Sequence, residues 1–228
     1  MPLYTADALI LRTYKLGEAD RIVVFLTRDR GKKRGVAKGA RRPRSRFAAA
    51  LEPMTEVRLA YFEKERRELV GLNYAETVRS PLAFAMSRER PPDGGPHGGS
   101  SPDALGYIGY FAELLDEWAQ EADADDRLYR LGASMLDALT AGAPVEPLAR
   151  YFEYWLLRLQ GVYQVDPQLS DEALVFLAAV RASSPLAIGK QAVSRRALLE
   201  IEAAHREQIA MHLEKELKSV RVLREMRR

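Results

Sequence analysis

RDRGKKRGVAKGARRPRSR, residues 28–46, carries ten basic side chains in nineteen positions, with Asp29 as its only acid. Glycines at positions 31, 35 and 39 and a proline at position 43 interrupt the stretch, which predicts loop and turn rather than one long helix. A polyanion lying along such a surface releases counterions from its phosphates, the main source of affinity in nucleic-acid binding. We therefore expect a DNA or RNA partner. The alternative is a solvated charged loop with no binding role.

The side chains expected to contact phosphates are Lys32, Lys33, Arg34, Lys38, Arg41, Arg42, Arg44 and Arg46. Phosphate contacts carry no base identity, so we expect binding that is largely independent of sequence. Three aromatic side chains, Tyr14, Phe47 and Tyr61, are candidates for stacking on bases if they are exposed. For Phe47 and Tyr61 a place in the protein core is the favoured interpretation.

The charge of the chain is unevenly distributed. Residues 1–80 contain 18 lysines and arginines against 10 acids, whereas the remaining residues contain 17 against 22. The net charge of +3 therefore conceals a basic first part and an acidic second part. This asymmetry predicts a basic nucleic-acid module joined to a roughly neutral or acidic body.

The first 80 residues have the pattern of a small β-barrel. Apolar runs and alternation predict five short strands at 3–14, 22–26, 34–38, 55–62 and 69–78, with a brief helical piece at 46–51. The turn at 15–20 has hairpin length, so the first two strands are expected to pair antiparallel. We predict a five-stranded OB-fold barrel over residues 1–80, with an SH3-like barrel as the structural alternative.

Helical periodicity dominates residues 81–228, which we predict to be an all-α domain, making the chain α+β in two domains. A short helix is expected at 82–90, followed by a flexible Gly/Pro/Ser segment at 91–102. Further helices are predicted from residue 103, at 126–141, 146–160 and 170–182, and as one long final helix at 194–226. The histidines at 205 and 212 lie seven apart on that final helix and are interpreted as edge-of-core residues.

The sequence offers little chemistry of catalysis. No cysteine is present, which excludes disulfides, thiolate zinc sites and a cysteine nucleophile. The residues around Gly189-Lys190 do not fit a phosphate loop, and no HExxH or GxSxG motif occurs. We therefore expect a binding protein and not an enzyme, with no cofactor and no metal. With no apolar run of membrane-spanning length and no leader pattern, we expect a cytoplasmic location, associated with the nucleoid, and no membrane partner.

Several short motifs together resemble the bacterial RecO family of recombination mediators. They are Gly17-Glu18-Ala19-Asp20, then Lys38-Gly39-Ala40-Arg41 followed by Ser45-Arg46-Phe47, Leu51-Glu52-Pro53, and Leu217-Lys218-Ser219-Val220-Arg221 near the C-terminus. The resemblance implies binding of single- and double-stranded DNA and annealing of complementary strands without ATP. It also implies partnership with RecR and single-stranded-DNA-binding protein in loading RecA during DNA repair and recombination.

Many members of that family carry a four-cysteine zinc motif near what are here residues 161–189. Because this chain has no cysteine, we expect the segment to keep a related shape without metal, held by apolar side chains such as Leu174, Phe176 and Leu177. Two other functions remain open from the residues. One is a protein-interaction scaffold whose helical domain binds an acidic partner tail, and the weaker one is a carboxylate-based metal nuclease.

Overall fold

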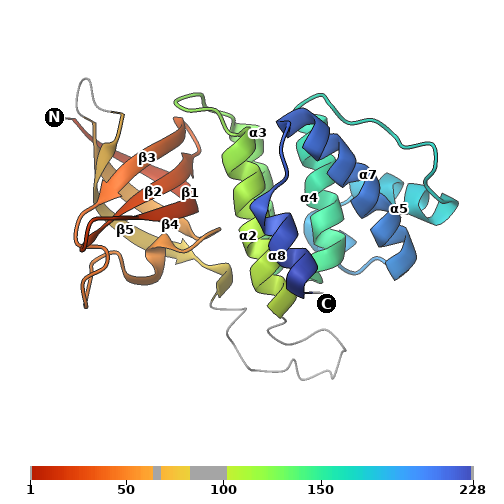
Figure 1. Ribbon diagram of the computed structural model, residues 1–228, viewed down its shortest axis with the longest axis horizontal. Coiled ribbons are helices and arrows are strands. Elements are labelled where there is room, and N and C mark those ends of the chain that lie inside the picture. Colours follow the sequence, from red (N-terminus) through yellow and green to blue (C-terminus); the bar gives the residue numbers. More distant parts are fainter. Residues whose placement is uncertain (1, 64–67, 83–101, 227–228) are drawn as a thin grey trace. The chain divides into compact units, whose positions relative to one another are not determined.

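The computed structural model describes residues 2–63, 68–82 and 102–226 (Figure 1). The short helix expected at 82–90 and most of the segment at 91–102 lie outside the described residues. The chain divides into two compact units, of which unit 1 comprises residues 1–83 with 108–136, and unit 2 comprises 84–107 with 137–228. Among the described residues, no helix is both long enough and apolar enough to cross a membrane.

The predicted five-stranded barrel with a helical region after it is confirmed. Its strands are β1 (Leu3–Leu16), β2 (Asp20–Thr27), β3 (Gly31–Ala37), β4 (Glu56–Phe62) and β5 (Val70–Arg79). They close in the order β1-β2-β3-β5-β4, and only β3 and β5 pair in parallel (Figure 1). The 3-10 helix η1 (Ala48–Leu51) lies between β3 and β4, as expected. Strand β3 starts three residues earlier than predicted, at Gly31, so the strand itself carries the first lysines of the basic stretch.

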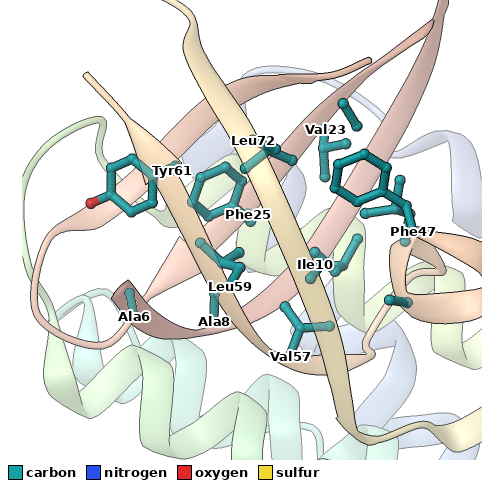
Figure 2. Packing of buried hydrophobic residues seen from close by; sticks show 14 of the residues in the cluster. Ala6, Ala8, Ile10, Val23, Phe25, Phe47, Val57, Leu59, Tyr61 and Leu72 are labelled. Atoms are coloured by element: carbon teal, nitrogen blue, oxygen red, sulfur yellow. The ribbon is translucent and has the colours of Figure 1, made fainter. Parts of the chain in front are cut away.

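The interior of the barrel is an apolar cluster to which every strand contributes side chains. Alternate residues of each strand point to the same face, so Ile10, Phe25 and Leu59 meet inside. Figure 2 shows Phe47 in the same cluster, although it comes from the loop before η1 rather than from a strand. Burial of these side chains, at roughly 25 cal/mol per Å² of apolar surface, stabilises the barrel on which the basic stretch is mounted.

Residues 108–136 cover part of the outer face of the same barrel. Gly132 packs closely against Leu9 of β1 and Leu115, because a β-carbon there would lie 2.6 Å from Leu9 Cδ1 and 2.9 Å from Leu115 Cδ1. At the edge of β3, the amide of Lys32 donates to the carbonyl of Gln120 at 3.1 Å, and the amide of Ala122 donates to the carbonyl of Lys32 at 3.1 Å. These bonds satisfy backbone groups that an open strand edge would leave exposed.

Gly31 lies so close to the backbone of Asp123 that only glycine fits at this position. Its φ is +66°, and a β-carbon there would lie 2.2 Å from the carbonyl oxygen of Asp123. We expect Gly31→Ala to lower the free energy of unfolding of unit 1 by about 2–3 kcal/mol, because strain and backbone displacement add. Gly17→Ala is the matched control, with φ of +57° and no atom near the new methyl group, and should cost only about 1 kcal/mol. Equal urea midpoints for the two variants would contradict this.

The helices are α2 (Pro102–Trp118), α3 (Asp126–Thr140), α4 (Val145–Leu159), α5 (Asp171–Ala182), α6 (Pro185–Ile188), α7 (Arg195–Leu213) and α8 (Lys218–Met226). The prediction of one continuous final helix at 194–226 was wrong. Glu214 ends α7 in the left-handed conformation, with φ of 53°, and the chain restarts as α8. The apolar spacing continues across this break, so periodicity alone did not reveal it.

The segment at 161–189 is only partly held as expected. Phe176 and Leu177 are buried, whereas Leu174 is 39% exposed and does not hold the segment. Polar contacts to α7 contribute instead: the amide of Gln164 donates to Gln208 at 2.8 Å, and the amide of Ser170 donates to Glu200 at 3.2 Å.

A buried charge network joins α4 to α7 in unit 2. Arg150 Nη2 lies 2.7 Å from Glu153 Oε1, and His205 Nδ1 lies 3.1 Å from Glu153 Oε2. Glu202 lies 2.8 Å from the other Arg150 nitrogen, Nη1. His205 is thus fully inside the core rather than at its edge. Burial lowers the pKa of His205 despite the neighbouring Glu153 carboxylate.

Candidate nucleic-acid interface

The basic stretch falls into two parts with different surroundings. In strand β3, Lys32 Nζ lies 3.4 Å from Asp116 and Lys33 Nζ lies 2.7 Å from Glu63. Arg34 Nε donates to Glu121 at 2.8 Å. Each of these three cations therefore already has a carboxylate partner within unit 1.

One of these carboxylates, Asp116, lies on helix α2, which the sequence did not connect with the basic stretch, whereas Glu63 follows β4 and Glu121 follows α2. Glu113, Asp116 and Glu117 on α2 all lie near Arg12 of β1, with Asp116 nearest at 3.2 Å. Their spacing of three and four residues places them on one face of the helix. The spacing of these three acids is the sequence feature that could have indicated an acidic face on this helix. Its partner strands lie more than 80 residues away, so sequence alone did not show what the acids contact.

The second part, residues 38–46, is a loop of successive turns. The amide of Arg42 donates to the carbonyl of Gly39 at 3.0 Å, and the amide of Ser45 donates to the carbonyl of Arg42 at 3.1 Å. Gly39 and Arg44 both have positive φ, at 71° and 60°. The loop conformation is thus defined by its own backbone bonds.

This loop is fastened to the turn between β1 and β2. Arg41 Nη1 donates to the carbonyls of Gly17 and Glu18, at 3.0 and 2.8 Å, and the Arg41 amide donates to the carbonyl of Ala19 at 2.9 Å. The amide of Gly39 donates to the Asp20 carboxylate at 2.8 Å. The two motifs that are separated in sequence, 17–20 and 38–41, therefore form one structural element. Asp20, which the sequence did not mark as a site residue, is part of it.

Four loop cations face solvent without an acid partner. Lys38, Arg42, Arg44 and Arg46 are exposed, and in the described part of the chain they form no ion pair. Arg46 instead lies over the buried ring of Phe47, 5.1 Å from its centre. The structure thus places four of the eight predicted basic residues in one loop with uncompensated charge, and the exposed Arg41 of the same loop bonds to backbone carbonyls.

The three aromatic candidates occupy different environments. The rings of Phe47 and Tyr61 are fully buried in the barrel cluster, which confirms the interpretation of both as core residues. Burial, with the Glu63 carboxylate second, raises the pKa of Tyr61 to about 12, so its hydroxyl stays neutral. Tyr14 is 45% exposed on β1. It is therefore the one candidate of the three with a surface that a base can reach.

Arg41 is expected to hold the loop rather than to act as another free charge. In Arg41→Ala, the loss of two bonds to backbone carbonyls should increase amide hydrogen exchange both at 38–42 and at 17–20, by roughly tenfold if about 1.4 kcal/mol is lost. The matched control is Arg42→Ala, which removes the same charge one position away and should change neither segment. Faster exchange in the loop alone, with the 17–20 turn unchanged, would contradict the linkage between the two motifs.

No candidate metal centre is found: within residues 2–63, 68–82 and 102–226, no three His, Asp or Glu side chains are placed to hold an ion. Acids of unit 1 instead pair with arginines or lysines, as at Asp126 with Arg28. The arrangement on unit 1 is suited to binding a polyanion along a preformed loop.

Comparison with known proteins gives a consistent family match. The family model described as Recombination protein O N terminal matches residues 1–81, and Recombination protein O C terminal matches residues 99–165. Proteins named DNA repair protein RecO from Koribacter versatilis and Symbiobacterium thermophilum are each 37% identical, over 70% and 71% of this chain. These alignments span 59% and 58% of the two relatives, so the match covers less than two thirds of their length.

Proposed function

The chain belongs to the Recombination protein O family of DNA repair proteins, and from this premise we propose that it binds DNA strands through the loop at 38–46 and anneals complementary strands. The observation that carries the proposal is the set of exposed, uncompensated cations, Lys38, Arg42, Arg44 and Arg46, on a loop fastened to the barrel. The β3 cations contribute less to DNA binding in this proposal, because carboxylates of the same unit already neutralise them.

Preorganisation of the loop supports binding without a large ordering cost. A flexible basic segment loses backbone entropy of about 1–2 kcal/mol per residue when it is fixed on a ligand. Here the turns of the loop and the Arg41 bonds hold the backbone before DNA arrives. More of the electrostatic attraction to phosphates therefore remains as affinity.

Annealing follows from charge neutralisation. Two DNA strands repel each other through their phosphates, and cations bound along one strand reduce this repulsion and release counterions. Base pairing then supplies the favourable free energy, so no nucleotide hydrolysis and no catalytic group of the protein are required. The contacts are with phosphates, so single and double strands are both bound with little sequence preference.

Family membership also supports a role in a larger assembly. We extend the proposal to partnership with RecR and single-stranded-DNA-binding protein, and through them to loading of the RecA recombinase in recombinational DNA repair. The site of action in this proposal is the cytoplasm, at the nucleoid. Binding assays of the full chain with each of these partners would test this extension separately from annealing.

The proposed activity is tested by following annealing of two labelled complementary oligonucleotides in EDTA without nucleotide. Wild-type protein should accelerate annealing, and the variant with Lys38, Arg42, Arg44 and Arg46 changed to alanine should lose most of the acceleration. The control removes four other exposed charges, at Arg58, Arg127, Arg130 and Arg181, and should keep it. Equal loss in both variants would indicate that net charge alone is responsible and would contradict the assignment to the loop.

A further inference from the structure

The outward-facing side chains of strands β1, β2 and β3 form rows across the barrel. Residues opposite each other in paired strands share a face, so the register defines each row. Leu9, Leu26 and Lys32 form one row, Arg12, Val24 and Arg34 form the next, and Tyr14, Ile22 and Val36 form the third. The third row is the nearest of the three to the turn between β1 and β2.

The first two rows are covered within unit 1. Leu9 and Leu26 are buried, and Val24 is only 3% exposed although it points away from the barrel interior. The cations of these rows pair with carboxylates from residues 113–121. Lys32 and Arg12 pair with Asp116, and Arg34 pairs with Glu121. The apolar side chains of these two rows are therefore covered, whereas the Arg34 side chain at the end of the second row is 47% exposed.

The third row is left partly open. Tyr14 is 45% exposed, and Ile22 and Val36 are half-buried. Arg12 fixes the tyrosine at the border of the covered area, because its Nη1 donates to the Tyr14 hydroxyl at 3.0 Å while its Nη2 pairs with Asp116. The third row is therefore a small apolar surface. At one end of it, Arg12 holds the Tyr14 side chain and is itself held by Asp116.

The residues around this third row indicate which class of ligand it can bind. Lys38 follows Val36 by two residues and begins the loop of uncompensated cations, and Arg41 fastens that loop to the turn that follows β1. An apolar, aromatic strip bordered by free cations complements a ligand with flat apolar faces and a chain of negative charges. Single-stranded nucleic acid with unstacked bases has both features.

We propose that the Tyr14, Ile22 and Val36 row is a base-stacking strip that receives unpaired bases while the loop at 38–46 holds their phosphates. This proposal rests on the proposed DNA binding and adds to it the class of strand that the site distinguishes. A duplex keeps its bases stacked inside and reaches only the loop. A single strand uses both surfaces, so the strip gives the protein a preference for single strands over duplexes.

The test measures binding of full-length protein to three fluorescent probes of equal length, about 16 nucleotides, the upper site size of an OB barrel. The probes are a thymidine single strand, a strand of the same length made of abasic residues, and a duplex. Tyr14→Ala should weaken binding of the thymidine strand about tenfold, towards the affinity for the abasic strand, and leave the other two probes unchanged. Tyr14→Phe keeps the ring and should keep the affinity.

Tyr74→Ala is the matched control, because Tyr74 is 37% exposed on β5 of the same barrel but outside the row. An equal effect of Tyr14→Ala on the thymidine and abasic strands, or no effect on either, would overturn the strip. The salt dependence measured with the abasic probe reports the loop separately. If loop variants change the salt dependence while Tyr14→Ala leaves the affinity for the thymidine strand unchanged, the base-stacking strip is wrong but phosphate binding by the loop is supported. If loop variants leave the salt dependence unchanged, the proposed DNA binding through the loop is itself wrong.

Discussion

Changing Lys38, Arg42, Arg44 and Arg46 together to alanine is expected to flatten the slope of log K against log salt by about 3 for a single-stranded oligonucleotide. Each phosphate contact with a single strand contributes roughly 0.7 to that slope, and four contacts are removed. At low salt the affinity should fall roughly 30-fold or more, taking about 0.5 kcal/mol for each exposed ion pair. Fluorescence polarisation over a range of salt concentrations measures both quantities.

The informative control is a variant with Lys32 and Arg34 changed to glutamine. These two side chains belong to the same basic stretch, but their charges already meet Asp116 and Glu121. The slope should therefore change much less than it does in the loop variant, although unit 1 loses two ion pairs. A larger change in slope from the strand variant than from the loop variant would place the DNA path on β3, against the division of the stretch proposed here.

Glu153→Ala should lower the free energy of unfolding of unit 2 by about 3 kcal/mol or more. The change removes one of two carboxylates beside Arg150, of which the remaining Glu202 is partly exposed, and breaking a buried ion pair typically costs 3–5 kcal/mol. Arg150 is 3% exposed, and His205 is 1% exposed, so neither can turn to solvent without opening the core. Urea unfolding monitored by circular dichroism measures the effect.

Two comparisons make this prediction specific. Glu200→Ala removes a carboxylate of α7 that lies closer to the surface, where it pairs with the exposed Arg196 and accepts the Ser170 amide, and should cost no more than about 2 kcal/mol. Binding of a single-stranded oligonucleotide to folded Glu153→Ala should keep the wild-type salt slope, because the network contains none of the loop cations. A loss no greater than that of Glu200→Ala would contradict the structural importance of the network.

The same network predicts how acid affects stability. Burial lowers the pKa of His205 from its ordinary value of 6.5, so the unfolded chain binds a proton more readily than the folded chain. The stability that neutral His205 contributes is therefore fully present above pH 6.5 and is lost as the pH falls through the lower pKa of the folded state. Urea midpoints at several pH values should show a smaller acid dependence for His205→Gln than for wild type. An unchanged dependence would assign the effect to other groups.

The barrel was predictable because its signals are local. Alternation in residues 56–62 and the glycine turn between the first two strands follow from the two-residue period of a strand and from turn chemistry. The break before α8 was not predictable in this way, since Glu214 adopts a left-handed conformation that its residue type does not favour, inside a continuing apolar pattern. Leu174 was assigned to the core because α5 is apolar on most of its surface, and only the fold shows which side is covered.

The candidate site was predictable as a stretch but not as a surface. Counting charges treats Lys32 and Lys38 alike, whereas their roles differ because Asp116 lies beside one of them and no carboxylate of the described residues pairs with the other. That difference depends on a contact between residues 84 positions apart. In the same way, the link between Arg41 and the Gly17 carbonyl explains why two separate motifs occur together, which spacing in the sequence does not reveal.

Binding of phosphates along the loop at 38–46 can be detected by hydrogen–deuterium exchange of the full chain with and without a single-stranded oligonucleotide. We expect slower exchange in peptides covering 38–46 and the 17–20 turn, with little change in peptides from α7 and α8. Protection confined to α7 and α8, with the loop unchanged by DNA, would contradict the claim and assign the binding surface to the helical unit.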